Sequence, residues 1–146
     1  MLLASAICSC SEKQPETTEP MITKTEIQVE NGLLTPEIMH RLGKVGDVQV
    51  SPNHAKILYG VSYTSIEQNK GNRELYLMNV DGSENLKITN TPKSESNARW
   101  INDSQIIYMR SGKLYTATIE GSTLKNETEV AGAEGMESFE LSPAGD

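Results

Sequence analysis

The sequence predicts an all-β protein built from repeated four-stranded units. The first observation is residues 72–91, NRELYLMNVDGSENLKITNT, in which a run of strand formers leads to Asp81-Gly82 and a second short apolar stretch follows. An Asp-Gly pair between two such stretches is a strong signal for a β-hairpin. The second observation is that this pattern recurs about 40 residues later, as KLYTATIEGSTLKNETEV.

Two further matches precede and follow these hairpins. Residues 57–59, ILY, match residues 106–108, IIY, and residues 48–52, VQVSP, match residues 139–143, FELSP. A repeat of about 40–50 residues that carries four short strands is typical of a β-propeller blade. The alternative is an ordinary all-β sandwich with two similar hairpins, but the shared order of the matched elements favours repetition. We therefore expect a partial β-propeller of about two blades and the start of a third.

The strand at residues 74–80 is apolar on both faces. Leu75 and Leu77 point one way, and Tyr76, Met78 and Val80 point the other way. Such a strand should lie between two layers, as blades do in a ring. We therefore expect the chain to be a piece of a larger ring, with apolar faces that further blades would cover.

The chain divides into six expected segments: a remnant of an export or lipoprotein signal at residues 1–10, a polar tether at 11–32, a short lead-in helix at 33–46, blade one at 47–93, blade two at 94–135, and the truncated start of blade three at 136–146. The expected strands are residues 47–50, 56–63, 74–80 and 86–89 in blade one, and 98–101, 105–110, 113–119 and a weak strand near 127–130 in blade two. Trp100 takes the place of Val50 and should pack between the blades.

The N-terminal residues, MLLASAICSC, form a short apolar segment that ends in small residues. Ile7-Cys8-Ser9-Cys10 resembles a bacterial lipobox, which makes Cys10 a candidate lipid attachment site. We expect an exported protein, in the bacterial periplasm or anchored by lipid to the envelope. Cys8 is unusual in such a box and a basic region is missing, so we expect the true start upstream of Met1. The alternative is a frayed terminus with two incidental cysteines.

The lead-in helix has signals at both ends. Thr35 can cap its N-terminus, Pro36 fits the first helical position and Glu37 suits the positive end of the helix dipole. Gly43 can end the helix.

Composition excludes several classes of function. The formal net charge is −7 and no basic cluster is present, which argues against nucleic acid or an anionic membrane as a partner. Contact with a membrane is expected only through the lipid anchor. The two histidines and two cysteines give no metal-ligand spacing, and no glycine motif precedes a helix to hold phosphate. We expect no metal and no cofactor.

No catalytic residues are visible in this chain. No serine lies in a G-x-S-x-G motif, and His54, in the turn SPNH, is expected to be solvated. The carboxylates are also expected to be solvated residues of loops and turns: Glu67, Glu74, Glu84 and Glu95.

The first repeat carries a ten-residue insertion relative to the second, expected as a long loop at residues 62–73. Loops at one rim of a propeller often line its binding face. The candidate rim residues are Tyr63, Glu67, Asn69 and Arg73. The alternative is an ordinary solvated insertion.

These residues also carry a family resemblance. Residues 34–37, 48–52, 57–59, 66–70 and 73–82 together resemble the opening of bacterial prolyl oligopeptidase family serine peptidases, above all exported dipeptidyl peptidases and acylaminoacyl peptidases. The resemblance covers residues 33–146 and depends on the order of the motifs, because each blade motif also occurs in non-enzymatic propellers of the TolB type.

The resemblance implies an N-terminal propeller that gates access for short peptide substrates and a C-terminal α/β-hydrolase domain that bears Ser, Asp and His. None of those catalytic residues maps onto this sequence, and residues 101–103, IND, stand where the family repeat often has Ser-Pro-Asp. We expect a propeller fragment of a serine exopeptidase whose hydrolase domain belongs to the same parent chain. The alternative is part of a periplasmic binding propeller.

Overall fold

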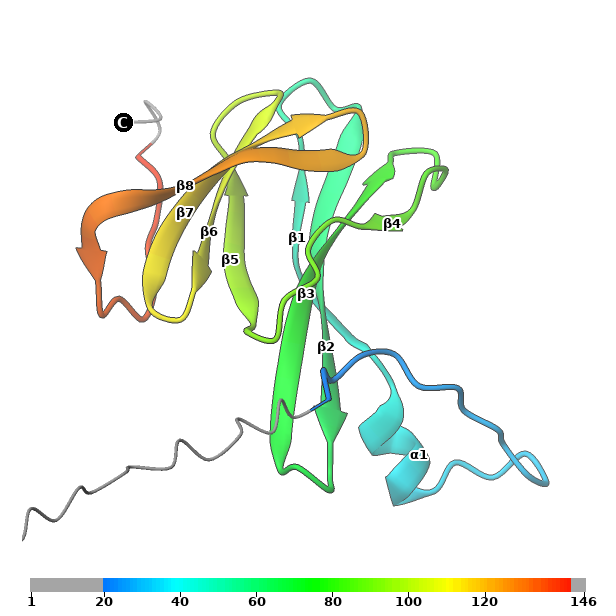
Figure 1. Ribbon diagram of the computed structural model, residues 1–146. Coiled ribbons are helices and arrows are strands. Elements are labelled where there is room, and N and C mark those ends of the chain that lie inside the picture. Colours follow the sequence, from blue (N-terminus) through cyan, green and yellow to red (C-terminus); the bar gives the residue numbers. More distant parts are fainter. Residues whose placement is uncertain (1–19, 143–146) are drawn as a thin grey trace, which may run out of the picture.

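The computed structural model describes residues 20–142 as two β-sheets with one short helix (Figure 1). The elements are α1 (Pro36–Arg41), β1 (Lys44–Val50), β2 (Lys56–Ser65), β3 (Lys70–Asn79), β4 (Leu86–Lys87), β5 (Glu95–Trp100), β6 (Gln105–Arg110), β7 (Lys113–Glu120) and β8 (Thr123–Glu134). Each sheet is an antiparallel meander, in the order β1-β2-β3-β4 and β5-β6-β7-β8. The prediction of an all-β chain with two four-stranded units is confirmed. Neither sheet closes on itself, and the propeller stays a prediction.

The helix follows its sequence signals at the start and departs from them at the end. Thr35 is the N-cap, its hydroxyl accepting the Ile38 N–H at 3.4 Å, and Pro36 opens the helix. The C-cap is Leu42 in an extended conformation, so Gly43 does not end the helix through a left-handed turn. Gly43 is instead needed for close packing, because a Cβ there would lie 2.9 Å from the Tyr63 ring.

The first strands of the two sheets share a bulge. Asp47 and Asn97 adopt φ values of 51° and 53°, each where the pairing with the next strand shifts register. The Asn97 amide N–H donates to Asp47 Oδ2 at 3.1 Å, and Asn97 Nδ2 donates to the Phe139 carbonyl at 2.9 Å. The indole N–H of Trp100 also donates to the Gln49 carbonyl at 3.4 Å. Equivalent or adjacent positions of successive repeats are therefore joined directly.

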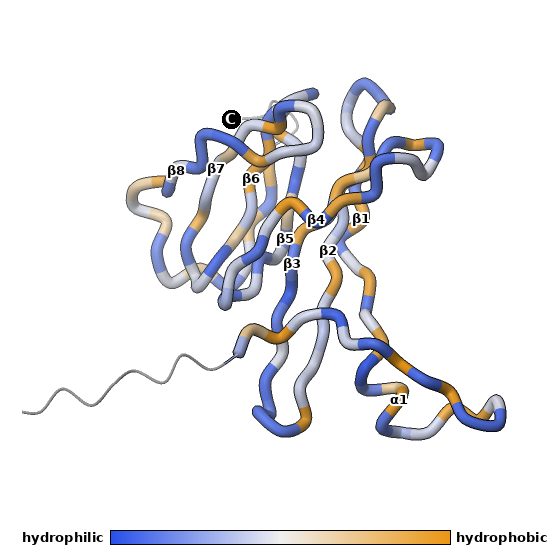
Figure 2. The backbone as a smooth tube through the Cα atoms, turned by 45° about the vertical axis from the view of Figure 1, so that its right-hand side comes forward, coloured by the Kyte–Doolittle hydropathy of each residue, from blue (hydrophilic) through white to orange (hydrophobic). Residues whose placement is uncertain are grey.

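The main core lies between the two sheets. Its fully buried members are Leu58, Leu75 and Leu77 from the first sheet with Ala98, Ile106 and Tyr108 from the second, joined by the nearly buried Trp100, Ala117 and Ile119. The strands β1, β2 and β3 all contact β5. Figure 2 shows hydrophobic stretches on the strands of both sheets and also around α1. The prediction that Trp100 packs between the repeated units is confirmed for the two sheets.

A second, smaller cluster covers the far face of the second sheet. Its buried members are Ile107, Met109 and Leu114, against which Met136, Phe139 and Leu141 pack. The segment expected to begin a third unit thus lies against the second sheet as the second sheet lies against the first. Large apolar side chains remain exposed elsewhere, including Val45, Val48, Val50, Val80 and Leu86, each at least 48% exposed.

Several predicted elements differ in length from the observed ones: β1 and β5 each begin three residues earlier than expected, β4 is only two residues long, and the two largest differences are the loop at residues 62–73 and β8. The expected loop at residues 62–73 is mostly strand, since β2 and β3 pair without interruption down to Ser65 and Lys70. The end of this hairpin projects beyond the other strands of the structure (Figure 1). Only four residues turn, closed by the Asn69 N–H donating to the Ile66 carbonyl at 3.1 Å. The strand expected to be weak, β8, is the longest of the eight in residues 20–142. Cross-strand pairs of its glutamates with β6 and β7 support it.

Candidate functional site

The four predicted rim residues do not converge on one site. Tyr63 lies on β2 beside α1, while Glu67 and Asn69 lie in the exposed turn of the projecting hairpin. Arg73 lies on β3, turned toward β1, where its Nη2 pairs with Asp47 Oδ2 at 2.9 Å. Arg73 is therefore held in place as part of the sheet.

Of the surface cavities that flank the hairpin where residues 20–25 cross it, two are lined by predicted rim residues. The first, of about 310 Å³, is lined by residues 20–23 and 25, by Arg41 and by the hairpin tip at 64–68, so it includes Glu67. A hydrogen bond to its own backbone amide and one from Ser65 lower the pKa of the Glu67 carboxyl. The second, of about 230 Å³, is lined by Thr23, Lys24, Tyr63, Glu74, Tyr76 and Lys87. Burial, followed by the neighbouring Tyr63, raises the pKa of Tyr76 to about 12.

Gly60 makes room for the side chain of Arg73, which gives a first prediction. A Cβ at Gly60 would lie 2.4 Å from Arg73 Nε. Gly60→Ala should displace the guanidinium from Asp47 and Ser62 and lower the free energy of unfolding by about 1–3 kcal/mol, measured by urea denaturation. Gly71→Ala is the matched control on the same hairpin, because its nearest atom would lie at 3.4 Å. Equal losses in the two variants would contradict the close contact.

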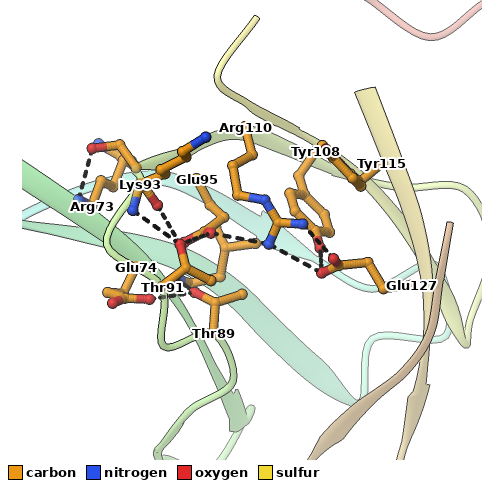
Figure 3. Close-up of polar contacts among 12 residues, drawn as sticks. Arg73, Glu74, Thr89, Thr91, Lys93, Glu95, Tyr108, Arg110, Tyr115 and Glu127 are labelled. Atoms are coloured by element: carbon orange, nitrogen blue, oxygen red, sulfur yellow. Dashed lines mark hydrogen bonds and ion pairs between the residues drawn. The ribbon is translucent and has the colours of Figure 1, made fainter. Parts of the chain in front are cut away.

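The densest polar cluster lies in the seam between the sheets (Figure 3). Two of its carboxylates come from opposite sheets, Glu74 on β3 and Glu95 at the start of β5, and they are 2% and 0% exposed. The prediction that both are solvated was wrong. Buried carboxylates are rare unless they are paired or hydrogen-bonded.

Glu74 is satisfied by its neighbours in the first sheet. The Thr89 hydroxyl donates to Oε2 at 2.8 Å and accepts the Leu75 N–H at 2.8 Å. Asn72 Nδ2 donates to Oε1 at 3.2 Å, and Lys87 Nζ lies 3.9 Å away. Side chains within one sheet thus compensate the buried charge.

Arg110, at the end of β6, connects the second sheet to this cluster. Its guanidinium donates to both carboxylate oxygens of Glu127 on β8, and its Nη1 lies 3.5 Å from Glu95 Oε1. The Arg110 guanidinium carbon also lies 4.3 Å from the ring centroid of Tyr115, in a cation–π contact. The Tyr108 hydroxyl donates a hydrogen bond to Glu127.

The ionisation of this group follows from its contacts. Burial disfavours the charge of Arg110, but the hydrogen bonds and charge of Glu127 outweigh burial and raise its pKa. Burial likewise opposes ionisation of Glu127, yet the hydrogen bonds from Arg110 and Tyr108 lower its pKa. Burial raises the pKa of Tyr108, and Glu127 adds to the shift. Arg110 and Glu127 therefore form a charged pair beside a neutral phenol.

The described residues offer little for catalysis or for a metal. His40 and His54 are both exposed, so neither provides the oriented imidazole of a Ser-His-Asp triad. Within residues 20–142, no group of three or more His, Cys, Asp or Glu side chains is placed to hold a metal ion. The same part of the chain contains no helix long and apolar enough to span a bilayer. The candidate lipid site Cys10 lies outside the described residues.

Comparison with known proteins gives a partial relationship. No model of a protein family matches the chain. Over 97 residues, 66% of its length, the chain is 31% identical to dipeptidyl-peptidase 5 of Porphyromonas endodontalis. Over 80 residues, 55% of its length, it is 35% identical to dipeptidyl-peptidase 5 of Porphyromonas gingivalis. The matches span only 13% and 12% of those relatives. The similarity supports, at most, a relationship to the peptidase family.

Proposed function

We propose that this chain is the N-terminal propeller part of an exported serine exopeptidase that releases dipeptides or acylaminoacyl residues from short peptides. The observation that carries the proposal is the similarity to two dipeptidyl-peptidases 5. The catalytic Ser, Asp and His would belong to an α/β-hydrolase domain of the same parent chain, and the propeller would gate the access of peptides.

The contacts between successive sheets support the propeller. The bulge of β5 donates to the bulge of β1 through Asn97 and Asp47, and the same Asn97 reaches Phe139 in the next repeat. A repeating contact of this kind suits units that stack around a ring. The exposed apolar residues of β1 fit a strand whose neighbours lie in further blades.

The proposal includes export of the protein and attachment of a lipid to Cys10. A lipid on Cys10 would place the propeller at the envelope, and residues 11–32 would serve as its polar tether. Short peptides outside the cytoplasm would then be the substrates.

The test uses the full-length product of the parent gene. Its reading frame should encode further blades and then a G-x-S-x-G motif, an Asp and a His. The purified protein should release chromophore from N-terminal dipeptide or acylaminoacyl substrates and should react with a fluorophosphonate, which labels activated serines. Further blades followed by a stop codon, with neither labelling nor release, would overturn the proposal and favour a binding propeller of the TolB type.

A further inference from the structure

The carboxyl group of Glu95 lies at a buried position where protonation would affect the contacts between the two sheets. The residue begins β5, directly after the connection that joins the two sheets, and its side chain is fully buried. Its Oε2 has no hydrogen-bond partner in the described part of the chain. An ionised carboxylate in such a position is costly, because each oxygen lacking a donor loses the solvation that water would give it.

The contacts of the Thr91 hydroxyl indicate whether Glu95 carries a proton. Thr91 Oγ1 lies 2.7 Å from Glu95 Oε1 and 2.6 Å from the Lys93 carbonyl oxygen, and it accepts the Lys93 N–H at 3.2 Å. A hydroxyl has a single proton to donate, so it cannot serve two acceptors at once. A proton on Glu95 satisfies both contacts, because Glu95 then donates to Thr91 and Thr91 donates to Lys93.

The charges around Glu95 also favour the neutral form. Arg110, from β6, lies 3.5 Å away, but its guanidinium is already paired with Glu127 of β8. Glu74 of β3 adds a second negative charge, which Lys87 of β4 offsets at 3.9 Å. Burial first, and the negative charge of Glu74 next, raise the pKa of Glu95 above its ordinary value of 4.5, against the contact with Thr91 and the charge of Arg110.

We propose that Glu95 is a proton-operated clasp on the seam between the two sheets. Protonated, it closes the 91–93 connection onto β5 through Thr91. Deprotonated, it leaves Thr91 with one proton for two acceptors, so the hydroxyl must give up either Glu95 or the Lys93 carbonyl, and two buried carboxylates, Glu74 and Glu95, then lie on the seam. The clasp borders a cavity of about 380 Å³ lined by residues 88–91 and 124–127, so its release would loosen one wall of that cavity. This inference is independent of the proposed peptidase activity.

The sign of the pH dependence follows from linkage. The folded protein binds the proton more tightly than the unfolded chain, so the contribution of Glu95 is fully present below pH 4.5 and is lost as the pH rises through the raised value. One proton changes the folding equilibrium by at most about tenfold per pH unit across that window.

Two measurements on the full 146-residue chain test the clasp. The carbon NMR signal of the Glu95 carboxyl should titrate with a midpoint above 4.5. The free energy of unfolding should be measured by denaturation from pH 4 to pH 8. In the wild-type chain it should fall as the pH rises, and in Glu95→Gln it should fall less, because the neutral amide donates to Thr91 at every pH. Glu120→Gln, at an exposed glutamate on β7, should keep the wild-type pH slope.

The contrary results are equally definite. A midpoint at or below 4.5, or an unchanged pH slope in Glu95→Gln, would overturn the clasp. A Glu95→Gln protein that fails to fold at acid pH would also overturn it, since the amide reproduces the donor of the protonated acid. The NMR titration of the wild-type chain decides the matter without any variant.

Discussion

Replacing Leu75 by alanine is expected to lower the free energy of unfolding by about 2–5 kcal/mol. Leu75 is fully buried in the cluster that both sheets share, where it packs in the same core as Ala98 and Trp100 of the second sheet. Alanine would leave a cavity on the seam, because the backbone of β3 is fixed by pairing on its β2 side. The fluorescence of Trp100, the single tryptophan, reports this loss from the opposite sheet during urea denaturation.

The control for this change is another leucine of the first sheet. Leu86, on β4, is 48% exposed, so Leu86→Ala should change the free energy of unfolding by less than about 1 kcal/mol. If Leu75→Ala left the Trp100 transition where it was, the two sheets would unfold independently. The shared core would then not be a source of stability.

The strands were predictable because their signals are local. The apolar run at residues 74–80 and the Asp81-Gly82 turn specify a hairpin within a few residues, and Gly82 does adopt a positive φ of 85°. The sequence repeat further predicted that the two four-stranded units have the same order of strands, which no single strand shows. The bulges at Asp47 and Asn97 escaped prediction, because their left-handed backbone depends on a hydrogen bond between residues 50 positions apart.

The lengths of strands were less predictable because they depend on partners. Residues 62–73 have polar stretches that favour a loop, yet two antiparallel strands that already pair continue pairing at little cost until a turn stops them. β8 contains poor strand formers: Asn126, Glu127, Glu129 and Glu134. Its strand is stabilised by Arg110 and Lys113 across the sheet, and pattern alone does not show those contacts.

The buried polar cluster was missed for the same reason. Glu74 begins an apolar run and Glu95 follows a polar connection, so each has the spacing of a solvated residue. Only the packing of one sheet on the next removes both from water. A usable signal existed in Arg110, a cation that directly follows the apolar strand at residues 106–109 and therefore needed a buried anion nearby.

Arg110→Met is the second change with a large expected effect. Methionine keeps an unbranched apolar stem against Tyr115 but removes the charge that Glu127 and Glu95 face. Removing the arginine leaves Glu127 with the Tyr108 hydroxyl and water as partners, because Glu127 is 36% exposed, and we expect a cost of about 1.5–3 kcal/mol. Urea denaturation of the full chain at neutral pH measures the loss.

The comparison that isolates this cause uses two further variants. Lys113→Met removes a neighbouring pair with Glu129, in which both side chains are about two-fifths exposed, and should cost far less than Arg110→Met because water already screens that pair. Adding Glu127→Gln to Arg110→Met should recover part of the lost stability, since the buried charge disappears with its partner. If the double variant were as unstable as the sum of the two single changes, the pair would contribute only packing. The seam would then depend on its apolar core rather than on the charge of the arginine.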